Sequence, residues 1–312
     1  MNVARADGKE RNMKIGFIGL GNMGAPMVKR LVAAGHDITG YDVMESAMAA
    51  LSEVKMDFSN DILTAAREKE VVITMLPNGK VLKGVVEAII PIMPKGSCFI
   101  DCSTVDINTT MQLAKLLKNA AIHVLDAPVS GGVSGAVAGT LTFMVGGSEE
   151  SFAIGKPLFE IMGQRMIHCG ADGAGQAAKI CNNMILGVTM IATCEAFALA
   201  DDLGLDRQKL FDVVSTSSGN SWSMSTYCPA PGVGPKSPSD NDYLPGFSAA
   251  LMLKDLTLSQ QAAEINGTPT RAGKLALELY QDFVKSSEGG ALDFSAILNK
   301  LSTGQEKNSK KP

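Results

Sequence analysis

A glycine-rich motif near the amino terminus constrains the fold of this chain more than any other feature. The largely apolar stretch KIGFIG, residues 14–19, runs into GLGNMG, residues 19–24, which has the spacing G-x-G-x-x-G. An amphipathic pattern, APMVKRLVAAG at 25–35, follows and predicts a helix. A strand, a glycine turn and a helix in this order form the phosphate-binding unit of a doubly wound α/β sheet. A glycine turn that binds no ligand is the structural alternative.

A second short strand pattern, DITGYD at 37–42, ends in an acidic residue. Asp42 follows Gly21 by about 20 residues, where a carboxylate of a dinucleotide site binds the adenosine ribose hydroxyls. Its charge would repel the 2′-phosphate of NADP, and the next residue is Val43 instead of an arginine. The motif therefore predicts an NAD site, with NAD favoured over NADP. Its predicted contacts are Asp42 with Gly19, Leu20, Gly21, Asn22, Met23 and Gly24.

Strand patterns alternate with helix patterns as far as residue 132. Apolar strands are predicted at 71–78, 98–104 and 122–132. Ligands of doubly wound sheets bind at the carboxyl ends of the strands, and Leu76-Pro77 and Ser103-Thr104 fall at such ends. We expect these two pairs of residues to line the nicotinamide half of the dinucleotide, with ordinary loop positions as the alternative.

The stretch at 122–132 ends in Ser130, Gly131 and Gly132. Backbone N–H groups that no side chain covers can form an anion-binding nest, and a substrate carboxylate is its natural guest. A tight turn before the helix-like SGAVAGT at 134–140 is the structural alternative.

Beyond residue 173 the patterns become helical. The first of them begins GQAAKICNNMI at 175–185 and carries no charge between Lys179 and Glu195. Lys179 and Asn183 are four residues apart and would share one face of that helix. Because burying an ammonium without a partner is costly, this lysine is paired, exposed or catalytic. Further helix patterns occur at 206–219, 247–267, 270–287 and 293–301.

An irregular segment at 215–247 is rich in Gly, Pro, Ser and Asn. A segment of this length within a compact domain is usually functional or disordered. The segment contains the aromatic residues Trp222, Tyr227 and Phe247, which indicates that it packs against the rest of the protein.

These patterns predict an α/β protein in which an N-terminal Rossmann doubly wound sheet precedes an all-α C-terminal domain, joined by a long interdomain helix. We expect an NAD-binding domain at 13–173 and an all-helical substrate and oligomerisation domain at 174–302. The polar tail at 303–312 is expected to be disordered.

Composition narrows the partners and the compartment. The net charge of −4 and the aromatic content of 5% lack the basic, aromatic-rich character of nucleic-acid binding. Six cysteines without a C-x-x-C pair or a metal-ligand spacing indicate reduced thiols and no metal site. The uncharged run at 180–194 is too short to span a bilayer, and residues 1–12 lack an apolar signal region. We expect a cytoplasmic protein, with the mitochondrial matrix as the alternative, and a homodimer or homotetramer formed through the apolar helix.

Taken together, these motifs resemble those of the β-hydroxyacid dehydrogenase family over nearly the whole chain, from about Lys14 to Leu301. The resemblance is carried by GFIGLGNMGAPM, DAPVSGGVSGAVAGTLTFMVGG, GAGQAAKICNNM and KDL at 254–256. The segment SSGNSWSMSTYCPAPGV at 217–233 is similar to a W…Y-N-P-x-P-G-V segment of the branch that oxidises 3-hydroxyisobutyrate. Cys228 stands where that segment usually has Asn.

The resemblance implies a role for each site residue. Lys179 would be the catalytic acid/base and Asn183 would orient the substrate. Ser130, Gly131 and Gly132 would hold the substrate carboxylate, Thr104 and Lys254 would contact the cofactor, and Lys254 would also line the substrate mouth with Trp222 and Phe247. The implied reaction is the NAD-dependent oxidation of 3-hydroxyisobutyrate to methylmalonate semialdehyde, a step of valine catabolism.

The residues themselves support a lysine base. Oxidation of an alcohol needs a group that accepts the hydroxyl proton, and none of His36, His123 and His168 lies beside a glycine-rich loop. A partly desolvated lysine can exchange a proton near neutral pH. A structural lysine paired with a carboxylate is the alternative.

Other activities remain open from the sequence. Tartronate semialdehyde reductase, glyoxylate reductase and L-serine dehydrogenase use similar short acids. A non-catalytic NAD-binding scaffold is a further alternative, although such a protein would be expected to have lost Lys179 or Asn183.

Overall fold

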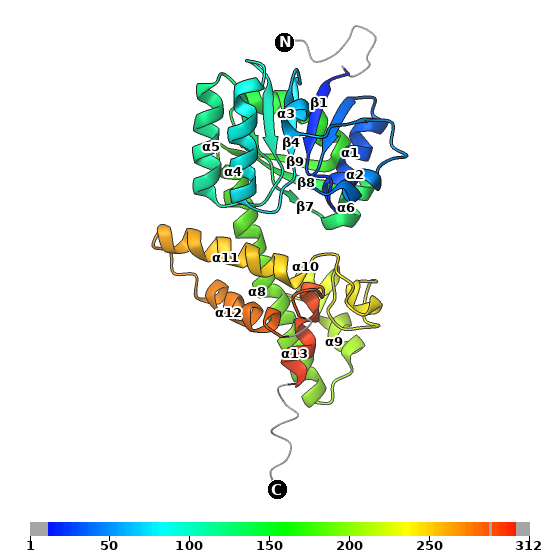
Figure 1. The fold of residues 1–312 in the computed structure, drawn as a ribbon. Helices are drawn as coiled ribbons and strands as arrows, with labels where there is room; N and C mark the ends of the chain where they lie inside the picture. Colours follow the sequence, from blue (N-terminus) through cyan, green and yellow to red (C-terminus); the bar gives the residue numbers. More distant parts are fainter. Residues whose placement is uncertain (1–11, 287–288, 304–312) are drawn as a thin grey trace. The chain divides into compact units, whose positions relative to one another are not determined.

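The structure is a computed structural model that describes residues 12–286 and 289–303 (Figure 1). Of the tail predicted at 303–312, residues 304–312 lie outside the described residues. The chain divides into two compact units, Met1–Lys179 and Ile180–Pro312. Each unit is described by itself below.

Within its described residues, the first unit contains a nine-stranded sheet with the order β3-β2-β1-β4-β5-β6-β8-β7, and β9 pairs with β8. Its strands are β1 (Lys14–Ile18), β2 (Asp37–Tyr41), β3 (Asp57–Phe58), β4 (Val71–Thr74), β5 (Cys98–Asp101), β6 (His123–Asp126), β7 (Val129–Ser130), β8 (Leu141–Gly147) and β9 (Gly163–Gly170). Strands β1 to β6 pair in parallel, whereas β8 runs antiparallel to β6 and β7. The strand order reverses between β1 and β4, which is the topological switch point where such sheets bind ligands.

Helices cover both faces of this sheet. They are α1 (Gly24–Ala33), α2 (Glu45–Ala49), α3 (Ile62–Ala66), α4 (Gly79–Ile89), η1 (Ile90–Ile92), α5 (Ile107–Asn119), α6 (Gly132–Ala138) and α7 (Glu149–Met162). Helices α1 and α6 lie on one face, and α4 and α5 lie on the other (Figure 1). Ile15 and Phe17 enter the first core while Ile18 enters the second. Burial on both faces explains why the strands read as continuous apolar runs.

Polar caps begin the two helices that follow the central strand ends. The side chain of Asn78 accepts a hydrogen bond from the Val81 N–H at the start of α4. The side chain of Asp106 does the same for Thr109 at the start of α5. These caps end the preceding loops at defined positions, so the loops at the carboxyl ends of β4 and β5 are short.

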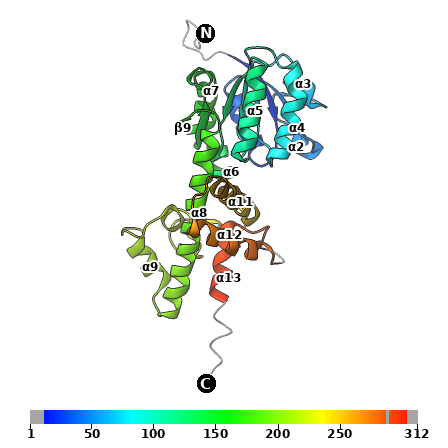
Figure 2. The ribbon, with the colours of Figure 1, turned by 90° about the vertical axis from the view of Figure 1, so that its left-hand side faces the viewer.

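The described residues of the second unit form helices joined by irregular segments, with no strand among them. Its elements are the larger part of α8 (Ala174–Asp202), then α9 (Arg207–Val214), α10 (Trp222–Ser225), η2 (Pro238–Asn241), α11 (Ala249–Ile265), α12 (Arg271–Val284), η3 (Phe294–Ala296) and α13 (Ile297–Thr303). Helices α11 and α12 pack side by side (Figures 1 and 2). Phe197, Leu256, Tyr280 and Phe294 form part of its core. The predicted fold class, a Rossmann sheet followed by an all-α unit, is confirmed.

Aromatic contacts anchor the irregular segment at 215–247 within this unit. Trp222 stacks on Tyr227 with a centroid distance of 4.7 Å, and Tyr227 stacks in turn on Phe294. Phe247 meets Phe294 edge-on. The hydroxyl of Tyr227 donates to Asp293 at 2.8 Å. The expected packing of this segment is therefore present.

The division between the units falls inside α8, whereas the boundary predicted from the sequence lies at residue 173, just before that helix. The beginning of α8 packs tightly on the sheet of the first unit. A Cβ atom on Gly175 would lie 2.3 Å from the carbonyl oxygen of Met144 and 2.5 Å from that of Asp126. Because only glycine permits this approach, the first turns of α8 belong with the sheet.

Helix α8 is the one helix of the described residues that is long and apolar enough to cross a membrane by length and composition. It has 29 residues and extends beyond the uncharged run at 180–194, which by itself is too short. Half of its most apolar window is buried inside the protein. Its buried polar residues include Gln176 and Asn183. These features fit the core helix of a folded protein.

Candidate active site

Three glycines of the turn after β1 have different surroundings. Gly19 has a φ of +98°, and a Cβ atom there would lie 2.3 Å from the Met75 carbonyl oxygen. A Cβ atom on Gly24 would lie 1.9 Å from the Gly19 carbonyl oxygen, so the start of α1 packs directly on the turn. At Gly21 a Cβ atom would meet nothing within 4 Å. The middle glycine thus borders open space where a pyrophosphate can approach the backbone, as a dinucleotide site requires.

Asp42 is held against the same turn. Its Oδ2 accepts a hydrogen bond of 2.7 Å from the Leu20 N–H, and its Oδ1 accepts one of 2.8 Å from the Met44 N–H. Val43 beside it is 80% exposed. The carboxylate therefore stands at the end of β2, next to the glycine turn, which is the geometry expected of a ribose-binding acid.

The side chain of Ser103 connects the two strand ends that are predicted to line the nicotinamide. Its Oγ accepts a hydrogen bond of 2.8 Å from the Leu76 N–H and donates one of 2.5 Å to Oδ1 of Asp101. The Leu76–Pro77 loop and Thr104 are consequently tied together at neighbouring strand ends. Thr104 is half-buried.

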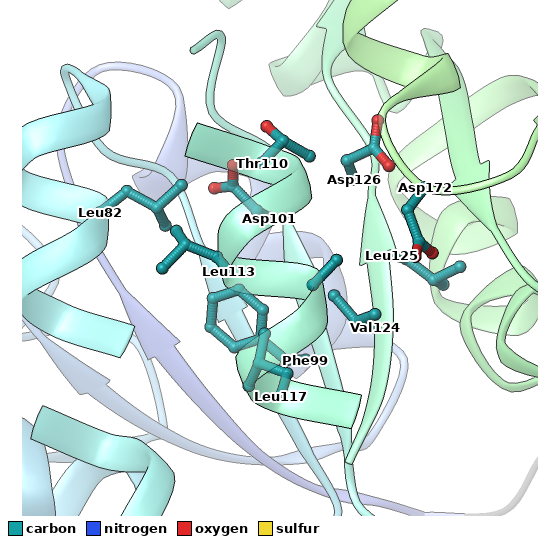
Figure 3. Close-up of a pocket in the computed structure, with 11 residues that line it drawn as sticks. Leu82, Phe99, Asp101, Thr110, Leu113, Leu117, Val124, Leu125, Asp126 and Asp172 are labelled. Carbon is teal, nitrogen blue, oxygen red and sulfur yellow. The ribbon is translucent and has the colours of Figure 1, made fainter. Parts of the chain in front are cut away.

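Two buried carboxyl groups lie at the last residues of β5 and β6. Asp101 and Asp126 pair in register on β5 and β6, and both line a cavity of about 20 Å³ (Figure 3). Burial raises the pKa of Asp101 to about 6, although Ser103 and Thr74 donate to it. Burial also raises the pKa of Asp126 to about 6. Asp126 accepts from the Gly173 and Gln176 N–H groups at 2.7 and 2.9 Å, so it caps the beginning of α8.

The lysine of α8 reaches the glycine-rich loop after β6. Lys179 is 8% exposed, and its Nζ donates a hydrogen bond of 2.8 Å to the carbonyl oxygen of Val129. Val129 immediately precedes Ser130, Gly131 and Gly132, and the two glycines have φ values of +127° and +61°. The ammonium therefore lies at the entrance to the segment predicted to bind a carboxylate.

In the second unit, Asp255 contacts two further predicted site residues, Asn183 and Lys254. Asn183 donates from Nδ2 to Oδ2 of Asp255 at 2.5 Å, and its Oδ1 accepts from Asn182 at 2.9 Å. Nζ of Lys254 lies 3.6 Å from Oδ1 of Asp255. Asn183 and Asp255 are buried, with 1% and 2% exposure. The amide of Asn183 is thus held at both ends, one helical turn after Lys179.

Comparison with known proteins identifies the family. Residues 14–170 match the family model described as the NAD binding domain of 6-phosphogluconate dehydrogenase. Residues 173–301 match the model described as NAD-binding of NADP-dependent 3-hydroxyisobutyrate dehydrogenase. A probable 3-hydroxyisobutyrate dehydrogenase of Mycobacterium tuberculosis is 45% identical over 92% of this chain and 97% of its own length. The chain belongs to the β-hydroxyacid dehydrogenase family.

A second relative and a solved structure are also similar over almost their full length. An NAD-dependent L-serine dehydrogenase of Pseudomonas aeruginosa is 40% identical over 91% of this chain and 96% of its own. The solved structure of a Mycobacterium tuberculosis 3-hydroxyisobutyrate dehydrogenase with L-serine is 44% identical and has a TM-score of 0.90, covering 93% of this chain and 99% of that one. The chain is accordingly an oxidoreductase with an NAD-binding domain, and the predicted cofactor NAD is confirmed.

Several residues that lie in or beside the predicted site have no role in the sequence-based prediction. They are Asp101, Asp126, Gln176, Asn182 and Asp255. A signal existed for two of them, because Asp101 and Asp126 end their strands at the ligand-binding edge. Asp255 lies within the KDL motif, of which only Lys254 was given a role.

Proposed function

We propose that this enzyme oxidises 3-hydroxyisobutyrate to methylmalonate semialdehyde with NAD, as a step of valine catabolism. The observation that carries the proposal is the position of the Lys179 ammonium, 2.8 Å from the carbonyl oxygen that precedes Ser130–Gly132. The residue proposed to transfer the proton and the loop proposed to bind the carboxylate are thus neighbours, which supports the oxidation of a hydroxy acid.

Cofactor binding is assigned to the turn after β1 and to the strand ends beside it. The turn from Gly19 to Gly24, with Leu20, Asn22 and Met23, would bind the pyrophosphate, and Asp42 would bind the adenosine ribose. Leu76, Pro77 and Thr104 would line the nicotinamide, and Lys254 is assigned a cofactor contact by the family resemblance. When bound, NAD supplies the hydride acceptor. The charge of Asp42 favours NAD over NADP.

Substrate binding is assigned to the loop at Ser130, Gly131 and Gly132. Both glycines have positive φ, a backbone conformation that other residues rarely adopt, so the N–H groups of this loop are not covered by side chains of their own, as an anion nest requires. Trp222, Phe247 and Lys254 would complete the substrate site.

The proton is assigned to Lys179. As hydride leaves the carbinol carbon for the cofactor, the hydroxyl proton would pass to the neutral amine of Lys179, and the substrate becomes an aldehyde. In the reverse direction the ammonium would protonate the carbonyl oxygen. Asn183, held by Asn182 and Asp255, would orient the substrate for this transfer.

Substrate identity is supported by the segment at 217–233 and by the mycobacterial relatives named for 3-hydroxyisobutyrate. L-Serine is the second candidate, because it is also a short 3-hydroxy acid. The similarity to an enzyme named NAD-dependent L-serine dehydrogenase and to a structure with L-serine favours testing it.

The deciding experiment is a substrate panel with the purified enzyme. Reduction of NAD and NADP is followed with 3-hydroxyisobutyrate, L-serine, glycerate and glycolate. We expect kcat/KM to be highest for 3-hydroxyisobutyrate with NAD. A higher value for L-serine would make the second candidate the main activity, and a higher value for glycerate or glycolate would contradict the proposal.

We also propose a homodimer or homotetramer in the cytoplasm, with the mitochondrial matrix as the alternative compartment. Apolar side chains on α8 support the assembly, since Ile185 and Leu199 are 60% and 57% exposed in the single chain. The similarity to bacterial enzymes supports the compartment. Light scattering after gel filtration would test the assembly, and cell fractionation would test the location.

A further inference from the structure

Gln176 is a buried amide that binds the peptide groups on both sides of Thr104. Its Nε2 donates a hydrogen bond of 2.8 Å to the carbonyl oxygen of Ser103, and its Oε1 accepts one of 3.2 Å from the Val105 N–H. The side chain of Gln176 is 0% exposed. The residue between the two contacts, Thr104, is therefore held from both of its neighbours.

The backbone of Gln176 is itself fixed to the sheet. Its N–H donates to Oδ2 of Asp126 at 2.9 Å, and the Gly173 N–H donates to Oδ1 of the same carboxyl group at 2.7 Å. Asp126 ends β6, beside Asp101 at the end of β5 (Figure 3). The first turn of α8 therefore cannot shift along the sheet without breaking these bonds.

Gln176 lies on the same helix as the proposed acid/base, Lys179. It precedes Lys179 by three residues on α8, so the two side chains project from neighbouring positions on the helix surface. One end of the linkage is the loop of Thr104, and the other is the helical turn that carries Lys179. Both ends lie within the first unit.

We propose that Gln176 is a positioning residue that sets the distance between the Thr104 loop and Lys179. The inference rests on the proposed function, which places the nicotinamide at that loop and the hydroxyl proton at Lys179. Hydride and proton leave adjacent atoms of the same alcohol, so the cofactor loop and the base must keep one spacing. A misplacement of about 1 Å can cost about 100-fold in rate.

The side chain at this position needs one donor and one acceptor. Glutamine supplies both, and a buried peptide group left without its partner is costly. Ionised glutamate still accepts a hydrogen bond from the Val105 N–H. Its second carboxylate oxygen, however, would face the Ser103 carbonyl oxygen, and two acceptors repel each other. Methionine has nearly the same length and provides neither contact.

The test compares Gln176→Met and Gln176→Glu with the control Gln208→Met, which removes an exposed glutamine that pairs with Asp212 on α9. We expect Gln176→Met to lower kcat by about 10- to 100-fold, with the Kd for NAD changed less than about twofold. Gln208→Met should behave as the unmodified enzyme. Normal kcat in Gln176→Met would overturn the inference.

Gln176→Glu separates positioning from general destabilisation and does not depend on how well Gln176→Met folds. A protonated glutamate again offers a donor to Ser103. Relative to the unmodified enzyme, its rate of semialdehyde reduction should therefore recover as the pH falls. A constant ratio across the pH range would count against the proposed contact.

Amide hydrogen exchange tests the linkage without any turnover. In Gln176→Met, exchange at the Val105 N–H should become at least about tenfold faster, while peptides from α4 and α7 exchange as before. Unchanged exchange at Val105 would overturn the inference even if activity fell. An unmodified enzyme that oxidised no 3-hydroxy acid would refute the proposed function, and the exchange rate at Val105 would still decide whether Gln176 holds this loop.

Discussion

Asp101 and Asp126 are register partners on neighbouring parallel strands, and their carboxyl groups line the same small cavity. A volume of about 20 Å³ is enough for one water molecule. Oδ1 of Asp101 receives hydrogen bonds from Thr74 and Ser103, whereas its Oδ2 has no partner in the described residues. Burial and the proximity of Asp126 both disfavour the ionised form of Asp101.

The first prediction concerns the pH dependence of stability. The pKa of Asp101 is raised to about 6 in the folded protein, so its favourable contribution is present below about pH 4 and is lost as the pH rises through about 6. Because asparagine does not ionise, Asp101→Asn removes this loss of stability. Relative to the unmodified protein, the variant should gain up to about 3 kcal/mol in the free energy of unfolding between pH 4 and pH 7. Denaturant unfolding across this range measures the difference.

Asp61→Asn is the matched control for Asp101→Asn. Asp61 is an exposed helix cap whose pKa is lowered, first by the backbone hydrogen bond from Thr64. Its contribution to stability is lost only as the pH falls below about 4, so relative to the unmodified protein the stability of this variant should stay level between pH 4 and pH 7. Parallel stability curves for Asp101→Asn and the unmodified protein would contradict the prediction.

The second prediction concerns Lys179. Lys179→Ala should lower kcat/KM by about 10² to 10⁴-fold, which is the usual contribution of general acid–base catalysis. Lys179→Arg should not restore activity, because arginine cannot release its proton near neutral pH. Oxidation by the unmodified enzyme should rise with pH, and reduction should prefer lower pH. Steady-state kinetics with a separate measurement of NAD binding would test this, and NAD binding should survive.

Lys83→Ala provides the control for Lys179→Ala, since Lys83 is exposed on α4 beside Glu87. It should leave both kcat and KM unchanged. A Lys179→Arg enzyme with normal turnover and an unaltered pH profile would show that the base is another group.

The third prediction concerns cofactor choice. Asp42→Ser with Val43→Arg should shift the ratio of kcat/KM for NADP to that for NAD by about tenfold or more. The substitution removes the repulsive carboxylate and adds a guanidinium at an exposed position, and guanidinium groups bind phosphate well. Val43→Arg alone keeps the carboxylate and should shift the ratio much less. An unmodified enzyme that already prefers NADP would contradict the assignment of Asp42.

The fourth prediction concerns the proposed carboxylate loop. Gly132 has a φ of +61°, which asparagine tolerates better than other side chains. Gly132→Asn should therefore preserve the backbone while its side chain hinders the substrate, raising KM by about tenfold or more. The Kd for NAD should stay within about twofold. Inhibition by simple short carboxylates should weaken in parallel with the substrate.

Gly204→Asn is the corresponding control, because Gly204 has a φ of +71° and open space around its Cα. It should leave KM unchanged. Equal losses of substrate and NAD affinity in Gly132→Asn would indicate a general fold defect and would remove the support for a carboxylate site.

The parts of the molecule that depend on local pattern could be predicted from the sequence. The strand at 14–18 and the glycine turn follow from a few adjacent residues, and the position of Asp42 follows from the spacing of that motif. The helices of the second half follow from their apolar periodicity. Strands β8 and β9 are not among the strands predicted from the sequence, and their pairing depends on β6, on β7 and on each other.

The sequence by itself determined the nucleotide-binding half, the change to an all-helical second half, and the presence of Lys179 and Asn183 one turn apart. Only the tertiary structure decided what holds those residues in place. Gln176 meets Ser103 across 73 positions of the chain, and Asn183 meets Asp255 across 72. The first contact depends on the register of the parallel strands and on how closely Gly175 lets α8 approach them. The second depends on how α11 packs against α8. No local pattern in the sequence encodes that register or that packing, so these partners meet only when the chain is folded.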